Sequence, residues 1–338
     1  MKKLSFFGKI LLLFTWLFAL LLLLAFFAPY ISPHIIPPLS LLSLAFPVLV
    51  LVNFLLLIYW LINLKKYFFI PLVLLMLNYN NLNRLFQWNG KHSVEGNGIT
   101  VMSYNVRLFN DYQQIKKKAI DVDISNFFKD QNPDILLVQE FRPHKKTDFS
   151  QYKYKFLGLK GKRKKMGTAI FSKYPIVNKG NFNFKNTYNN AIWADIKIKN
   201  DTIRVYCVHM QSHSVHPENI EGKDKVKLSN KITKVFEKQY DQARMIEKNM
   251  LSTKHKIILG GDFNNTAFSS TYRILRQDNY DAFVEAGQGF GFSWRYHFLP
   301  YRIDFLMIDK GFFVRDFKTL NYVKYSDHYP IKTLLKFK

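Results

Sequence analysis

The first 90 residues consist mainly of long apolar runs, whereas the rest of the chain alternates between short apolar and polar stretches. The run from Ile10 to Ala28 has no charged side chain, and its 19 residues come close to the ~20 that a helix needs to cross a bilayer. It exceeds the apolar core of a cleaved signal peptide, so we expect a retained membrane helix. A second uncharged run, Leu39 to Leu64, is also long enough to span, although Pro47 and Asn53 interrupt it.

A third apolar run, Tyr67 to Leu77, decides on which side of the cell membrane the rest of the chain lies. Its 11 residues are too few to cross alone, but Asn78 to Trp88 would complete the span at the interface, with Trp88 as an aromatic anchor. The basic N-terminus and the pair Lys65 and Lys66 indicate cytoplasmic segments. We therefore expect three spans, a multi-pass topology that places the remainder outside the cytoplasm. Two spans, with the third run lying on the membrane surface, would keep it inside.

A polar stretch with two glycines, Lys91 to Gly98, predicts a linker between a membrane region over residues 1–90 and a folded domain over residues 99–338. Strand-like runs dominate that domain, at residues 99–106, 134–140, 167–176, 191–198, 202–210, 256–263 and 303–310 and in a last run ending at Pro330. Helical spacing of apolar residues predicts helices at residues 113–128 and 225–251. A two-sheet sandwich with flanking helices, an α+β fold, would use all of these elements.

Composition excludes several classes of protein and shows an uneven charge. With 48% hydrophobic residues the chain is neither disordered nor fibrous, and its single cysteine excludes a disulfide scaffold. Residues 1–90 carry six Lys or Arg and no Asp or Glu, so the remaining 248 residues carry 43 basic and 24 acidic side chains, a net charge of +19. Such a domain attracts nucleic acids and anionic lipid headgroups alike, so charge alone does not choose between them.

Polar residues that hold metals or transfer protons lie at or just beyond the carboxyl ends of the predicted strands. They are Asn105, Glu140, His209, Asp262, Asn264, Asp304, Asp327 and His328. Singly, each is typical of a turn, a helix cap or a surface ion pair. Together, carboxylates and amides suit Mg²⁺ or Mn²⁺ better than zinc, which prefers Cys or clustered His. Phosphate-ester hydrolysis needs a divalent cation to polarise a phosphoryl oxygen and a histidine, held by a carboxylate, to take a proton from water.

The ordered motifs SYNV, QE, VHM, GDFN, RID and SDH resemble those of the endonuclease/exonuclease/phosphatase family, which includes deoxyribonuclease I, exonuclease III, neutral sphingomyelinases and inositol-polyphosphate 5-phosphatases. The resemblance covers residues 99–338. Membrane-anchored bacterial relatives have N-terminal apolar regions similar to residues 1–90. It implies a four-layer α/β/β/α sandwich of the deoxyribonuclease I type, preceded by an all-α transmembrane region. It also implies a metal-dependent hydrolase acting on phosphodiester or phosphomonoester bonds.

The resemblance further implies a metal site. Glu140 would be the principal ligand of Mg²⁺ or Mn²⁺, Asn105 would assist there, and Asp327 would supply a further carboxylate. Abasic-site endonucleases carry an acidic residue two positions after the first-motif asparagine, whereas this chain has Arg107. That departure removes support for a second metal.

The remaining residues of the set would act on the phosphate and the attacking water, again by resemblance. His209 would contact the scissile phosphate, and Asp262 and Asn264 would position the water and the phosphate. Asp304 would orient His328. His328 would then be the general base or, in another account of the family, the group that stabilises the transition-state phosphate.

Several alternatives stay open at the level of sequence. The basic segments at residues 160–165 and 223–238 would bind the phosphates of a polyanionic substrate, or would form only a solvated surface. Ser172 and Lys173 would contact phosphate, or would only support a strand. The substrate would be a nucleic acid or a phospholipid headgroup, because fold does not fix substrate. A catalytically silent, membrane-anchored binding domain is the alternative outside enzymes.

Overall fold

The computed structural model describes residues 4–88, 90, 98–113, 115–161, 165–213, 225–296 and 299–338. The chain divides into two compact units. The helical unit comprises residues 1–85, 215–240 and 265–273, and the sandwich unit comprises residues 86–214, 241–264 and 274–338. The predicted linker at residues 91–98 falls, apart from Gly98, outside the described residues, and the proposed domain boundary there stays a prediction.

The helical unit begins with four helices. They are α1 (Phe6–Phe27), α2 (Leu42–Ile62), α3 (Phe69–Leu77) and α4 (Tyr79–Leu85). With their flanking turns, α1 and α2 form helical stretches of 25 and 26 residues, long and apolar enough to cross a membrane. The nine residues of α3 do not reach that length in one continuous helix. Three spans, and with them the side of the membrane on which the sandwich unit lies, remain a prediction.

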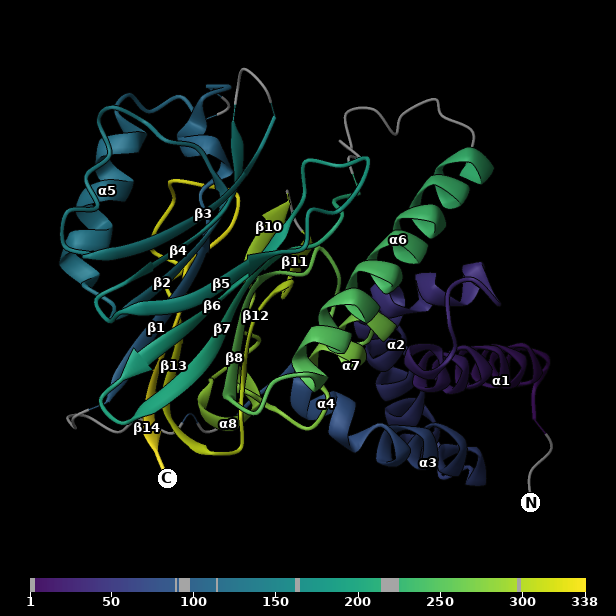
Figure 1. The fold of residues 1–338 in the computed structure, drawn as a ribbon. Coiled ribbons are helices and arrows are strands. Elements are labelled where there is room, and N and C mark those ends of the chain that lie inside the picture. Colours follow the sequence, from purple (N-terminus) through teal and green to yellow (C-terminus); the bar gives the residue numbers. More distant parts are fainter. Residues whose placement is uncertain are drawn as a thin grey trace. The chain divides into compact units, whose positions relative to one another are not determined.

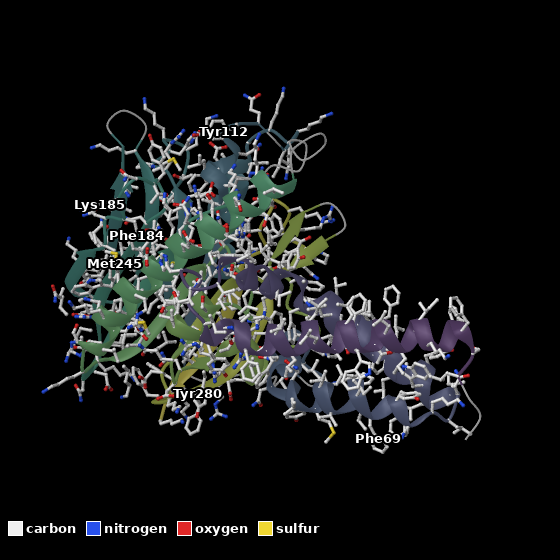
Figure 2. The ribbon with its side chains drawn as sticks, turned by 90° about the vertical axis from the view of Figure 1, so that its right-hand side faces the viewer. Phe69, Tyr112, Phe184, Lys185, Met245 and Tyr280 are labelled. Carbon is white, nitrogen blue, oxygen red and sulfur yellow. The ribbon has the colours of Figure 1, made fainter. Side chains whose placement is uncertain are left out.

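Buried polar groups join α1 to α2. The indole Nε1 of Trp60 donates a hydrogen bond of 2.8 Å to Oγ1 of Thr15, and the amide of Asn53 donates one of 3.1 Å to the carbonyl of Phe18. Hydrogen bonds of this kind between helices stabilise the association of apolar helices, in which the apolar side chains alone give little preference for one pairing over another. Asn53, which interrupts the second apolar run, is therefore a contact between helices. Apolar side chains also point outward, as Phe69 on α3 shows (Figure 2).

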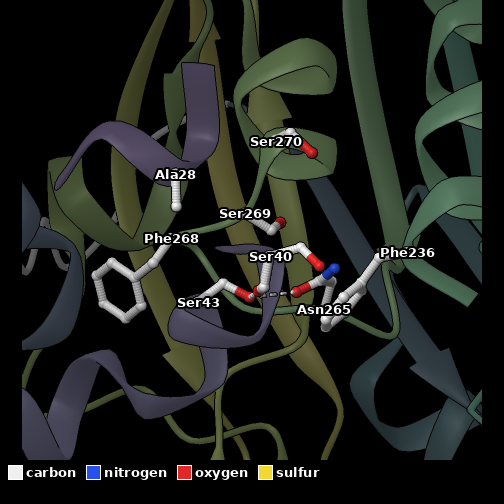
Figure 3. A pocket seen from close by; sticks show the side chains of 8 residues that line it. All are labelled: Ala28, Ser40, Ser43, Phe236, Asn265, Phe268, Ser269 and Ser270. Atoms are coloured by element: carbon white, nitrogen blue, oxygen red, sulfur yellow. Dashed lines mark hydrogen bonds between the residues drawn. The ribbon is translucent and has the colours of Figure 1, made fainter. Parts of the chain in front are cut away.

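A segment distant in sequence completes the helical unit. Oγ1 of Thr266 donates a hydrogen bond of 2.9 Å to the carbonyl of Ser43, and the Phe268 ring stacks on Phe46 with centroids 4.0 Å apart. Asn265 lies within 3.5 Å of the Ser43 hydroxyl, beside a small pocket lined largely by hydroxyl and amide side chains (Figure 3). Residues 265–273 thus pack within the helical unit, although they follow the GDFN motif directly.

Two six-stranded sheets form the sandwich unit (Figure 1). The first has the order β13-β14-β1-β2-β4-β3, with bounds Phe312–Thr319, Ile331–Phe337, Ile99–Asn105, Ile135–Phe141, Met166–Ser172 and Tyr154–Lys160. The second has the order β5-β6-β7-β8-β12-β9, with bounds Ile176–Asn181, Ala191–Ile198, Asp201–His209, Lys256–Asp262, Asp304–Ile308 and Tyr280–Asp281. A separate hairpin pairs β10 (Trp294–Tyr296) with β11 (Leu299–Tyr301).

The core lies between the two sheets, and helices cover their outer faces. Side chains from both inner faces, among them Leu137 and Leu306, are fully buried against one another. Helix α5 (Ile120–Gln131) packs on the outer face of the first sheet (Figure 1). The end of α6 (Lys225–Leu251) lies on the second, where the Tyr206 hydroxyl on β7 donates to Asn249. The predicted α/β/β/α sandwich, preceded by an all-helical region, is confirmed.

The boundaries of several elements differ from those predicted. The helix expected at residues 113–128 occupies residues 120–131 instead. The predicted strand ending at Pro330 is wrong, because β14 begins at Ile331 and the residues before it form a loop. The apolar residues of that loop, such as Leu320 and Val323, bury against α5 and the outer face of the first sheet, so their apolarity reflects burial rather than a strand.

Candidate functional site

Parallel strand pairs bring four of the predicted residues to one end of the sandwich. In the first sheet β1 runs parallel to β2, so Asn105 and Glu140 lie at the same edge. In the second sheet β7 runs parallel to β8, and the register pairs His209 directly with Asp262. The Asn105 amide bridges the two sheets, since its Nδ2 lies 2.9 Å from Oδ2 of Asp262 and 3.4 Å from Oε1 of Glu140.

Asp304, Asp327 and His328 reach the same end differently from what the sequence suggested. They do not follow the carboxyl ends of strands: Asp304 is the first residue of β12, and Asp327 and His328 precede β14. Because β12 is antiparallel to β8, its first residue pairs with Asp262. The beginning of β14 meets the end of antiparallel β1 in the same way.

His328 stands at the centre of the cluster. Its Nδ1 lies 2.8 Å from Oδ2 of Asp304, and its Nε2 lies 3.6 Å from Oδ2 of Asp262. Burial by itself lowers the pKa of His328, but the negative charges of Asp304, Asp262 and Asp327 outweigh it and raise that pKa to about 10. With Nδ1 engaged by Asp304, the ring presents Nε2 to the centre of the cluster.

The carboxylates of the cluster carry more negative charge than the neighbouring side chains balance. Burial raises the pKa of Asp262 to about 6, against the attraction of His328. The recessed position of Glu140 and the charge of Asp327 raise the pKa of Glu140 as well. One ligand atom from each of Asp262, Asp304 and His328 lies within 4.8 Å of the others. Oxygen donors with uncompensated negative charge fit a hard divalent cation such as Mg²⁺ or Mn²⁺.

His209 borders the carboxylates from β7. Its Nε2 lies 3.8 Å from Glu140, 3.7 Å from Asp262 and 3.0 Å from the amide nitrogen of Asn189. Burial lowers the pKa of His209 to about 4, so the ring is neutral at pH 7. Asn189 was not singled out in the sequence, because a polar residue in a loop carries no pattern of its own. Only the fold shows that it holds the His209 ring.

Asn264 and Asp327 lie at the margin of the cluster. The backbone N–H of Asn264 donates a hydrogen bond of 2.7 Å to Asp262, and its side-chain amide donates one of 3.0 Å to the carbonyl of Met210. Asp327 forms an ion pair of 3.3 Å with Arg107. Arg107, the departure noted in the sequence, thus neutralises a carboxylate beside the site.

Local backbone geometry directs the key side chains. Glu140 lies in a β-bulge between Val138 and Phe141 and has a φ of 49°, a left-handed conformation that is costly for a glutamate. Gly261, before Asp262, has a φ of 143°, and a Cβ there would lie 1.9 Å from the carbonyl oxygen of Val208. Only glycine fits at that position, which explains the second glycine of the LGGDFN segment.

A cleft of about 380 Å³ opens beside the cluster. Glu140, His209 and Asn189 form part of its wall, and Arg142 and the exposed rings of Tyr112 and Tyr188 form the rest. Tyr112 lies at the end of the sandwich unit that carries the site (Figure 2). Glu140 and His209 are therefore accessible from this cleft.

Other residues considered from the sequence lie elsewhere. Ser172 pairs with Ile135 at the start of β2, the end of the sheet opposite Glu140, and Lys173 binds Asp134 there, so neither lies at the site. The middle of the basic segment at residues 160–165 and the start of the one at residues 223–238 fall outside the described residues.

The sandwich and its buried cluster define a class of phosphate-ester hydrolases. A family model described as "Endonuclease/Exonuclease/phosphatase family" matches residues 102–328. The chain belongs to this family and is a hydrolase acting on phosphate esters. A second model, a domain of unknown function (DUF8431), matches residues 8–85. No curated protein matches the sequence.

Solved structures share the fold at low sequence identity. TDP2 from Caenorhabditis elegans has a TM-score of 0.55 at 16% identity, covering 73% of this chain and 100% of that one. An endonuclease/exonuclease/phosphatase from Beutenbergia cavernae has a TM-score of 0.53 at 14% identity, covering 72% of each chain. D. rerio TDP2 complexed with a single-strand DNA product has a TM-score of 0.53 at 15% identity, covering 71% of this chain and 100% of that one.

Proposed function

We propose that the protein is a membrane-anchored, divalent-metal-dependent phosphoesterase that hydrolyses phosphodiester bonds at the cluster around His328. The observation that carries this proposal is the convergence of Asp262, Asp304 and His328, with Glu140 and Asn105, at one end of the sandwich. The apolar helices α1 and α2 support the anchoring, since each is long enough to cross a bilayer.

In this proposal Glu140, Asn105 and Asp327 hold Mg²⁺ or Mn²⁺. The bound cation supplies Lewis acidity and neutralises charge on the phosphoryl oxygens. An acidic cluster with raised carboxyl pKa values is consistent with this role, because a cation would relieve the repulsion between Glu140 and Asp327.

The other residues act on water and phosphate. Asp262 and Asn264 position the attacking water, His209 contacts the phosphate, and Asp304 orients His328, whose Nε2 assists the attack as base or as stabiliser of the phosphate. Water adds its hydroxyl to phosphorus as one ester P–O bond breaks. The released alkoxide takes up the proton that the water loses, which gives an alcohol and a phosphate monoester.

The test uses the full chain, purified in detergent with a water-soluble phosphodiester as substrate. We expect hydrolysis with Mg²⁺ or Mn²⁺, loss of it with EDTA, and a fall in turnover of at least ~100-fold for His328→Ala. His255→Ala is the matched control, because that ring lies 40% exposed beside Asp195, away from the cluster. Turnover that survives EDTA would exclude the metal, and a folded His328→Ala variant of normal activity would exclude the assigned residue.

A further inference from the structure

Aromatic rings in edge-to-face and stacked contact lie at the point where the chain enters the sandwich unit. Gln87 and Gly289 exchange two backbone hydrogen bonds of 2.8 Å. Next to this pair lies an aromatic ladder of four rings, Trp88, Phe86, Phe290 and Phe292. Centroid distances are 4.9 Å from Trp88 to Phe86, 4.8 Å from Phe86 to Phe290 and 5.0 Å from Phe290 to Phe292.

The ladder leads into a groove of about 800 Å³. Phe290 and Phe292 line one part of it, and residues 317–322 with Lys324 line another. Three exposed cations, Arg295, Lys318 and Lys324, line it, and no described residue among its lining is acidic. Lys318 forms an ion pair of 3.3 Å with Asp316 next to the lining. The groove therefore combines an aromatic wall with positive charge, a surface that fits an amphipathic anion.

The groove adjoins the catalytic loop. Tyr329, which lines the groove, directly follows His328. The backbone N–H of Arg295 donates a hydrogen bond of 3.1 Å to the carbonyl of Asp327, and Trp294 forms a β-bridge with His328. A molecule bound in the groove is thus close to the cluster that would hydrolyse its phosphate.

The ladder begins directly after α4 in the sequence, so the length of the chain limits its distance from the apolar helix α3. The seven residues of α4 span only about 10 Å, and Phe86 follows α4 directly. The ladder therefore begins within roughly 20 Å of the apolar helix α3. Trp88 is 81% exposed and Phe290 45% exposed. Exposed aromatic rings close to apolar helices are typical of residues that sit at a membrane interface.

We propose that the aromatic ladder and the groove bind a phospholipid from the bilayer surface and present its phosphodiester to the site around His328. Arg295, Lys318 and Lys324 attract the anionic headgroup to the groove, and the glycerol and acyl region lies on the ladder while the phosphodiester reaches the site around His328. This inference rests on the proposed function and names its substrate class. The ladder begins directly after the apolar helical region of the chain, which favours a lipid over a nucleic acid as the occupant of the groove.

The experiment uses the full chain in nanodiscs of phosphatidylcholine and phosphatidylglycerol, with His328→Ala as the blank. Each variant is assayed by mass spectrometry for release of glycerol or glycerol phosphate from phosphatidylglycerol, and separately for hydrolysis of a water-soluble diester. We expect Lys318→Glu with Lys324→Glu, and separately Phe290→Ser with Phe292→Ser, to lower the ratio of the lipid rate to the soluble rate at least ~10-fold. Lys310→Glu, an exposed lysine outside the groove lining, should keep the wild-type ratio.

The outcomes separate this inference from the proposed function. If the wild type hydrolyses the soluble diester but no phospholipid, or if the groove variants keep the wild-type ratio, the proposal that the groove binds lipid is wrong. The proposed phosphoesterase activity would not be affected by either result. A loss of cleavage of a single-stranded oligonucleotide in the same variants, without loss on lipid, would assign the groove to nucleic acid instead. A wild type inactive on every diester would overturn both. The two lysine substitutions are on the surface, so they test the groove even if the phenylalanine variant fails to fold.

Discussion

At the scale of single residues, the same side-chain type takes different states in different surroundings. His328 and His209 are both buried and both border Asp262. The charges of three carboxylates outweigh burial and raise the pKa of His328, whereas burial outweighs the charge of Asp262 and lowers the pKa of His209. The residues differ because Asp304 binds the ring of His328 and the neutral amide of Asn189 lies against that of His209. The charge state of each histidine is therefore determined by its neighbouring groups rather than by its residue type.

The lone cysteine gives a test of this dependence on surroundings. Burial raises the pKa of Cys207 to about 12, so the thiolate that reacts with alkylating reagents is scarce at pH 8. We predict no detectable modification by iodoacetamide in the folded protein and rapid modification in denaturant. Intact mass spectrometry reads out a single addition, since the chain has one cysteine. Equal rates in the folded and denatured protein would contradict the buried position.

At the scale of elements, the segment after Asn264 links the catalytic motif to the helical unit. Residues 265–273 bind the helical unit through Ser43, Phe46 and Pro29, with Arg273 donating a hydrogen bond of 2.8 Å to the carbonyl of Pro29. The backbone of Asn264 holds Asp262, so the position of this segment affects the site through the chain itself. A fragment that starts at residue 99 lacks those partners.

We predict that Phe268→Ala destabilises the full chain and reduces its turnover. The ring is 4% exposed, and removing a buried phenylalanine costs on the order of 3 kcal/mol. Loss of its stacking on Phe46 would also loosen the segment after Asn264, so we expect a lower kcat with little change in KM. Thermal unfolding and steady-state kinetics in detergent measure the two effects.

Phe313→Ala is the control for this substitution, because the Phe313 ring is 48% exposed on β13. It should change the free energy of unfolding by less than about 0.5 kcal/mol. A Phe268→Ala variant as stable and as active as Phe313→Ala would show that the segment does not depend on the helical unit.

At the scale of the whole molecule, the distribution of charge and apolar length predicts its orientation. Lys65 and Lys66 follow α2 and favour the cytoplasm, and the apolar α3 follows directly. If α3 and α4 return through the bilayer, the sandwich unit lies outside the cytoplasm. If they lie on the surface, it lies inside.

We predict that alkaline phosphatase fused after Lys338 is active in cells, since that reporter folds only outside the cytoplasm. A green fluorescent protein fused at the same point should stay dark when exported through the general secretory route. Fluorescence together with an inactive phosphatase would establish two spans and an internal site. The paired reporters control for expression, because each orientation makes one of them positive.

The sequence by itself determined the apolar helices, most strands and the polar residues that converge at one end of the sandwich. Apolar runs and alternation are local patterns, and motifs such as GDFN and SDH keep their spacing along the chain. The predicted metal site and residue roles remain proposals, but the residues named for them do meet at one end of the sandwich.

Only the tertiary structure decided which strand ends meet, and therefore how the site is assembled. Asp304 and His328 reach Asp262 because their strands run antiparallel to β8 and β1, a pairing that no local pattern encodes. Asn189, the aromatic ladder and the packing of Phe268 on Phe46 likewise join residues far apart in the chain. Contacts of this kind depend on the register of the sheets and on long-range burial, which the order of residues specifies only once the whole chain has folded.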